Sequence, residues 1–200
     1  MRKILLTAVM AFMTIMTNAQ NTQHETGSFT LQPMLGAGFG YISGDWNVVL
    51  GEKKKLIAGI VVGVEGEYYA AKWLGISAGM NYAMQGWRFD YEDVSVVTRL
   101  NYLNFPVLAN IYVLKGLALK TGVQFGCLLN AKERESGEDF NIKDDCNKFC
   151  FSIPLGLSYE SGNFVFDARY NFAVSKAIDQ GDEKKRSQLI QLTVGYKFAL

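Results

Sequence analysis

Six charged residues fall on the polar side of segments in which apolar and polar residues alternate. They are Glu65, Glu67, Lys120, Asp167, Arg169 and Lys197. Side chains two residues apart on a β-strand point the same way, so paired carboxylates of this kind are candidates for acid–base chemistry. The same face also carries three cations, and charges buried together are expected to pair with one another. We therefore interpret the six as a structural network rather than as a catalytic site.

Histidine-dependent catalysis has no place in this sequence pattern. The only histidine, His24, lies before residue 29, where the first of the alternating segments described below begins. A Ser-His pair or an imidazole metal ligand within those segments is therefore excluded. We expect no enzymatic activity and no cofactor. A lipid-modifying or hydrolytic enzyme that works through carboxylates alone, in the membrane inferred below, is the alternative.

The three cysteines are scattered. Cys127 and Cys150 have opposite parity in neighbouring segments, which places them on opposite faces, too far apart for a disulfide. Cys146 and Cys150 can bridge only if the chain between them curls back, and the sequence leaves that pairing open. Three thiols spread in this way do not predict a metal site.

Residues 1–19 have the pattern of a cleaved secretory signal peptide. Arg2 and Lys3 precede an apolar run over 4–16, and small residues lead to a cleavage site after Ala19. The apolar run is shorter than the ~20 residues that a spanning helix needs. We therefore expect an exported chain with a flexible segment over 20–27 and one domain over 28–200.

Apolar residues alternate with polar ones through almost all of the exported chain. The sequence is 49% hydrophobic with mean hydropathy +0.05, yet it has no second apolar run long enough to span a bilayer as a helix. A period of two predicts half-buried β-strands. The alternating segments are 29–41, 56–68, 74–85, 103–113, 117–130, 149–159, 164–174 and 190–198. A net charge of +1 for the whole sequence gives no indication of nucleic-acid binding.

Eight strands with an apolar face and a glycine-rich, charged face indicate a transmembrane barrel rather than a soluble one. Connectors alternate in length, as they do in outer-membrane barrels. Long connectors over 43–55, 90–98, 133–147 and 176–185 alternate with short turns over 70–72, 115–116 and 161–163. An open edge in hydrocarbon would leave backbone groups unpaired, so the last strand must pair with the first. The prediction is an all-β, eight-stranded antiparallel up-and-down barrel in the bacterial outer membrane, with both termini and the short turns in the periplasm.

Four stretches of this chain carry a family resemblance. They are LNYLNFP at 100–106, TGVQFG at 121–126, DARYN at 167–171 and GYKF at 195–198. The chain resembles the PorT-like outer-membrane β-barrel family of Bacteroidota. The resemblance implies a small barrel, and it implies proximity to type IX secretion because the name-giving member assists that system. One departure is the end of the chain, where Ala199 and Leu200 follow the last aromatic residue, Phe198.

An eight-stranded lumen is filled by its own side chains, which argues against a transport channel. The expected role is structural, surface-binding or secretion-accessory, and a narrow small-solute channel is a further alternative. The expected partners are outer-membrane lipid and lipopolysaccharide, and the barrel-assembly machinery during biogenesis. Secretion-system and cell-surface proteins remain open as partners.

Two basic clusters are expected at the long-connector rim. They are Lys53, Lys54 and Lys55 before the second strand, and Lys184, Lys185 and Arg186 before the eighth. In a closed barrel only the first strand separates these strands, which puts the clusters about 10 Å apart at the strand spacing. Lys and Arg side chains bind phosphates, so this rim is a predicted lipopolysaccharide contact. The alternative is a solvated, partly neutralised charged loop.

Overall fold

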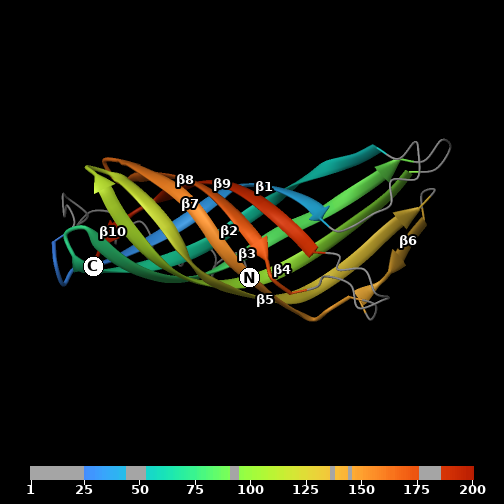
Figure 1. The fold of residues 1–200 in the computed structure, drawn as a ribbon, viewed down its shortest axis with the longest axis horizontal. Coiled ribbons are helices and arrows are strands. Elements are labelled where there is room, and N and C mark those ends of the chain that lie inside the picture. Colours follow the sequence, from blue (N-terminus) through green and yellow to red (C-terminus); the bar gives the residue numbers. More distant parts are fainter. Residues whose placement is uncertain (1–24, 44–52, 91–94, 136–137, 144–145, 176–185) are drawn as a thin grey trace, which may run out of the picture.

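The fold is a sheet of antiparallel strands closed into a barrel (Figure 1). A computed structural model describes residues 25–43, 53–90, 95–135, 138–143, 146–175 and 186–200. The strands are β1 (Phe29–Ser43), β2 (Lys53–Ala71), β3 (Leu74–Asp90), β4 (Ser95–Leu114), β5 (Leu117–Glu135), β6 (Glu138–Asn141), β7 (Phe149–Ser161), β8 (Phe164–Ala173), β9 (Arg186–Tyr196) and β10 (Phe198–Ala199). Among these residues no helix is long and apolar enough to cross a membrane.

Eight strands go around the barrel, as the alternating pattern predicts. Each pairs with the next along the chain, and the sheet closes where β1 pairs with both β9 and β10. β10 continues the β9 strand beyond Lys197 in the same register against β1, so the two count as one strand of the wall. β6 pairs only with the outer end of β5 and adds a hairpin beyond the barrel (Figure 1).

Burial alternates along the strands with the apolar residues outside. In β8, Phe164 and Phe166 are about half exposed, whereas Val165, Asp167 and Arg169 are buried. A soluble sheet would bury its phenylalanines and expose its charges, because water solvates ions and not hydrocarbon. Apolar side chains on the outside of a closed wall match a surface that faces lipid.

Small residues let neighbouring strands approach closely at the seam between β1 and β9. A Cβ placed on Gly36 would lie 2.0 Å from the backbone oxygen of Leu192, so glycine is required here by the path of the neighbouring strand. The inward-facing glycines predicted from sequence therefore have a physical role at this position. They allow strands to coil around a narrow interior.

The connectors follow the predicted alternation, but β2 already begins at Lys53, within the connector expected over 43–55, and two further connectors are shorter than expected. The short turns leave two residues between strands, for example Lys115 and Gly116 between β4 and β5, where Gly116 has φ of 78°. β3 runs to Asp90 and β4 starts at Ser95, so the connector expected over 90–98 is only 91–94. The connector expected over 133–147 contains β6 and the end of β5. In both places the strands continue beyond the apolar stretch on which the prediction was based.

One side of the barrel is much taller than the other. β2, β3, β4 and β5 have 17 to 20 residues each, whereas β8 has 10 and β9 has 11. A membrane-crossing strand needs only ~9–11 residues. The extra length lies at the end of the long connectors, where Figure 1 shows β6 at the opposite end of the barrel from β10. We call this extension of β2–β5 with β6 the tall wall.

The N-terminal segment is attached to the barrel where the structure describes it. Gly27 donates its backbone N–H to the carbonyl of Tyr69 at 2.8 Å, and Tyr69 donates to Ser28 at 3.0 Å. Gly27 and Ser28 therefore extend the pairing of β2 by one step, while the flexible segment expected over 20–27 stays a prediction. His24 and the predicted signal peptide over 1–19 lie outside the described residues.

Candidate functional site

Four of the six predicted charged residues meet inside the barrel, towards its short-turn end. The Lys120 Nζ lies 2.8 Å from Glu65 Oε1 and 3.0 Å from Asp167 Oδ2. The Arg169 Nη2 lies 3.1 Å from Glu65 Oε2 and 2.9 Å from Asp167 Oδ2. Their side chains are at most 3% exposed. Two carboxylates and two cations cancel, so this quartet holds no net charge.

The other two predicted residues form a second cluster near the short-turn mouth. Lys197 Nζ lies 2.8 Å from Glu67 Oε2 and 2.6 Å from Glu160 Oε1. It also donates to the Tyr69 hydroxyl at 2.8 Å. The Tyr112 hydroxyl lies 2.8 Å from Glu67 and 2.9 Å from Glu160, which joins both carboxylates across the lumen. Tyr112 points inward because it is even-numbered in β4, where the apolar residues of the alternating segment 103–113 are odd-numbered and face outward.

Sequence reasoning missed Glu160 as a member of this cluster. The residue stands next to the short turn after β7, one position beyond the alternating segment 149–159, and its even position continues the inward face of Ser152 and Ser158. Its acidic type opposite Lys197 was the available signal. To use that signal, one has to know the stagger between strands, because the stagger determines which residues of different strands lie at the same height in the barrel.

The interior clusters satisfy charge rather than present a reactive group. Every carboxylate in them lies against a cation, and Ser77 donates a further hydrogen bond to Glu65 at 3.0 Å. A general acid or base has to reach a substrate, and none of the carboxylates of the buried quartet faces open solvent. Within the described part of the chain, no group of three or more His, Cys, Asp or Glu side chains is arranged to hold a metal ion.

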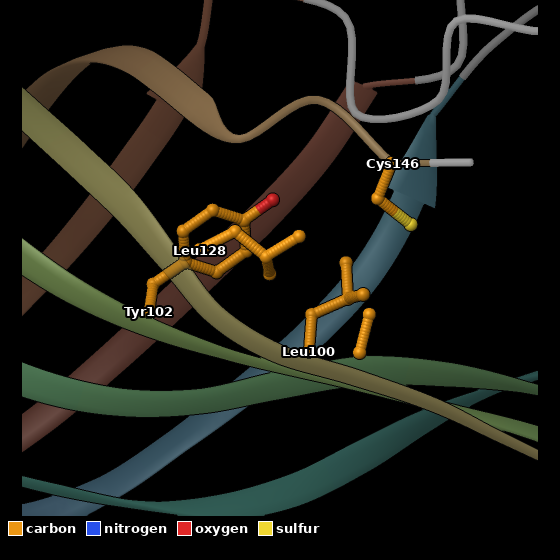
Figure 2. Close-up of a cluster of buried hydrophobic side chains, with 5 residues drawn as sticks. Leu100, Tyr102, Leu128 and Cys146 are labelled. Atoms are coloured by element: carbon orange, nitrogen blue, oxygen red, sulfur yellow. The ribbon is translucent and has the colours of Figure 1, made fainter. Parts of the chain in front are cut away.

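The other half of the lumen contains an apolar cluster that the sequence analysis did not foresee. Leu100 and Tyr102 of β4, Leu128 and Ala131 of β5, and Cys146 are buried together. Figure 2 shows the labelled side chains converging from the barrel wall and from the segment before β7. The end of this segment continues the pairing of β7 with β5, where the backbone N–H of Leu128 donates to the carbonyl of Lys148 at 2.8 Å, and Cys146 before it packs into the cluster. The cluster closes the interior beyond the charged layers.

A β-bulge in β5 explains how apolar residues reach the interior here. Asn130 pairs with Asn101, but Leu128 pairs with Tyr102, so Leu129 is an extra residue in β5. Before the bulge the odd-numbered residues of β5 face outward, and after it the even-numbered residues do. The alternation over 117–130 predicts that Asn130, like Lys120, faces the lumen, but Asn130 lines an outer pocket. The prediction was wrong because an inserted residue reverses the parity beyond it.

All three cysteines are free thiols. Cys127 pairs with Phe149 and Cys150 pairs with Gly126, which agrees with the opposite parities read from the sequence. Cys146 is 5% exposed and Cys150 packs against the same apolar cluster. The bridge between Cys146 and Cys150 that the sequence leaves open is not formed in this structure.

The described residues of the two predicted basic clusters belong to the strands on either side of β1. Lys53, Lys54 and Lys55 begin β2, and Arg186 begins β9. β1 pairs with both strands, as closure required. Lys184 and Lys185 lie outside the described residues. Contact of this rim with lipopolysaccharide stays a prediction.

A closed antiparallel barrel with an apolar outside and paired charges inside defines a transmembrane β-barrel of the outer-membrane class. Residues 18–179 match the family described as outer membrane protein beta-barrel domain, and the chain belongs to this family. No curated protein matched the sequence.

Solved structures show the same fold at low sequence identity. Ail, the attachment invasion locus protein of Yersinia pestis, is 17% identical with a TM-score of 0.53, covering 87% of this chain and 100% of Ail. Neisserial surface protein A (NspA) is 15% identical with a TM-score of 0.51, covering 85% of this chain and 96% of NspA. These similarities support the eight-stranded outer-membrane barrel.

Proposed function

We propose that this chain is a plugged outer-membrane barrel that presents its tall wall at the cell surface for binding. The observation that carries the proposal is the height of β2–β5, which have 17 to 20 residues where ~9–11 cross the membrane. The surplus is well-paired sheet rather than irregular loop. A rigid sheet held above the lipid is a surface suited to recognition and is not needed for anchoring.

The filled lumen supports a binding role over transport. The quartet of Glu65, Lys120, Asp167 and Arg169 lies across the interior, with the Lys197 cluster on one side and the apolar cluster of Figure 2 on the other. A solute would have to displace both paired charges and packed side chains. Ail and NspA carry names that refer to attachment and to the surface, which agrees with this role.

Two finer assignments belong to the same proposal. The short turns and both termini face the periplasm, because outer-membrane barrels have short turns on that side. The PorT-like, Bacteroidota assignment rests on the four sequence stretches quoted above. It makes assistance to a secretion complex the second candidate function.

Planar-bilayer recording tests the plug. We expect the folded protein to insert without stable single-channel currents, with a general porin as the positive control under the same conditions. Insertion is verified by the faster migration of unboiled protein in electrophoresis. Stable currents from the inserted protein would refute the plugged-lumen part of the proposal.

Site-directed labelling in intact cells tests the orientation. In a background with all three native cysteines replaced, Asn141→Cys places a thiol on β6 at the long-connector end and Lys115→Cys places one in a short turn. A membrane-impermeant maleimide should label the first in intact cells and the second only after lysis. The reverse pattern would contradict the orientation and with it the surface role of the tall wall.

A further inference from the structure

Two basic residues stand directly opposite each other on the outer face of the tall wall. Arg99 of β4 and Lys132 of β5 are register partners, and both are exposed. Like charges opposite each other on adjacent strands destabilise a sheet. Neither residue has an ion pair in the part of the chain that the structure describes. Among the described residues no carboxylate offsets these two charges, so the pair favours a bound anion.

A pocket of about 180 Å³ lies at this pair. Met84 and Val97 supply apolar lining, while Asn101 and Asn130, the next outward register pair, supply two amides. The Asn101 Oδ1 is buried and has no hydrogen-bond partner among the described residues. The pocket thus combines two cations with an amide acceptor that the protein leaves unused. The β-bulge at Leu129 turns Asn130 and Lys132 outward to complete it.

The height of the pocket relative to the lipid follows from the strands. Outward-facing apolar residues of β4 run from Leu103 to Val113, ten residue steps that cover ~33 Å of strand or ~25 Å of bilayer at the usual tilt of ~40°. Arg99 stands four residues beyond Leu103, which is ~10 Å above this band. Lys132 stands three residues beyond the exposed Leu129. Both cations therefore lie at the level of lipid head groups and outside the hydrocarbon.

Two further arginines surround the pair. Val97 pairs with Arg88 of β3 on one side and with Arg134 of β5 on the other. Both arginines have interactions of their own, so the site is built on Arg99 and Lys132. Their charge still adds to the positive potential of this patch.

We propose that this pocket binds a phosphate of a phosphorylated glycolipid in the outer leaflet, of the lipid A kind. The guanidinium of Arg99 offers two parallel donors to phosphate oxygens, and Lys132 adds a point charge. The acyl chains of such a lipid pack on the apolar band below the pocket, a contact that a soluble inorganic anion does not make. The inference rests on the orientation proposed above, with the long connectors outside the cell, and does not depend on the binding role of the tall wall. It concerns different residues from the predicted basic rim.

Native mass spectrometry of the full chain in detergent tests the site. The probes are bis-phosphorylated lipid A, the same lipid without phosphates, and inorganic phosphate as competitor. The double variant Arg99→Gln, Lys132→Gln should lower retention of bis-phosphorylated lipid A by about tenfold or more, since charge-assisted hydrogen bonds are lost. The matched control Lys72→Gln, Lys115→Gln removes the same number of charges from the short-turn end and should retain the lipid as the unaltered protein does.

A second variant keeps both cations and guards against a folding defect. Val97→Glu adds a carboxylate beside the pair and should also abolish retention, while unboiled samples of every variant still migrate as the compact form. Equal retention by the double variant and the control would overturn the proposal. Equal retention of the dephosphorylated lipid would overturn it as well, and displacement by inorganic phosphate at the lipid's own concentration would assign the site to a soluble anion instead.

Discussion

Replacing Arg169 by Met should destabilise the barrel strongly, because it removes one cation from a sealed quartet. The guanidinium is fully buried and contacts Asp167 through Nε at 3.2 Å and Nη2 at 2.9 Å, and Glu65 at 3.1 Å. After the substitution, Lys120 alone faces two buried carboxylates. Loss of one partner from a buried ion pair costs ~3–5 kcal/mol, chiefly because the remaining charge is left uncompensated. We expect the free energy of unfolding to fall by about this amount.

Restoring charge balance should recover most of that loss. Arg169→Met combined with Asp167→Asn leaves one carboxylate against Lys120, and a neutralised buried pair is often close to the original in stability. A double-mutant cycle should therefore give a coupling of ~2–3 kcal/mol between the two positions, within the range seen for groups in contact. Lys115→Met, in an exposed turn, is the matched control and should leave stability unchanged.

The assay is equilibrium unfolding in guanidinium, in detergent micelles or lipid vesicles, followed by tryptophan fluorescence and by the fraction of compact species in electrophoresis. The reasoning fails if Arg169→Met costs less than ~1 kcal/mol, which would mean that water reaches the quartet and screens it. It also fails if the two substitutions simply add, since independent sites add and members of one network do not.

Three further substitutions probe other levels of the barrel by the same unfolding assay. Gly36→Ala should cost ~1–3 kcal/mol, because the new Cβ meets the Leu192 carbonyl at the seam; a neutral result would show that the seam can widen. Cys146→Ser should cost ~1–3 kcal/mol by placing a hydroxyl in an apolar cluster, and thiol counting of the denatured protein should find three free thiols in the unaltered chain. Tyr112→Phe should cost ~1–3 kcal/mol by leaving buried acceptors beside Lys197 with one donor fewer, and an unchanged midpoint would indicate that water replaces the hydroxyl.

Alternation was sufficient to predict the strands and the inward face, because a lipid-facing wall has to keep a period of two over each crossing. It placed Asp167 and Arg169 inside and Phe164 and Phe166 outside, as the structure has them. It could not divide the charged residues into two clusters. That division depends on the stagger between strands, which the pattern within one strand does not contain.

The misses have local physical causes. The apolar interior cluster escaped notice because Leu100 and Tyr102 precede the stretch from which the fourth strand was predicted, and polar inward residues follow them. Phe198 was expected on the lipid-facing side, and its register with Leu31 agrees, yet it is only 2% exposed with its ring 4.8 Å from that of Tyr196. Neighbouring aromatic side chains can cover a residue that the backbone points outward. The alternating pattern indicates which way a side chain points, but it does not indicate whether neighbouring side chains cover it.

The closed seam makes the barrel a ring of strands in which no strand is structurally first. At the short-turn end Leu200 donates its backbone N–H to the carbonyl of Phe29 at 2.9 Å, so the two chain ends of the barrel lie side by side. The gap between them takes the place of one more short turn. A short linker from Leu200 back to residues 25–28 could therefore close it, and new ends could open at the turn of Lys115 and Gly116. Such a circular permutant keeps every strand neighbour of the natural chain, so its order of synthesis changes while its architecture does not.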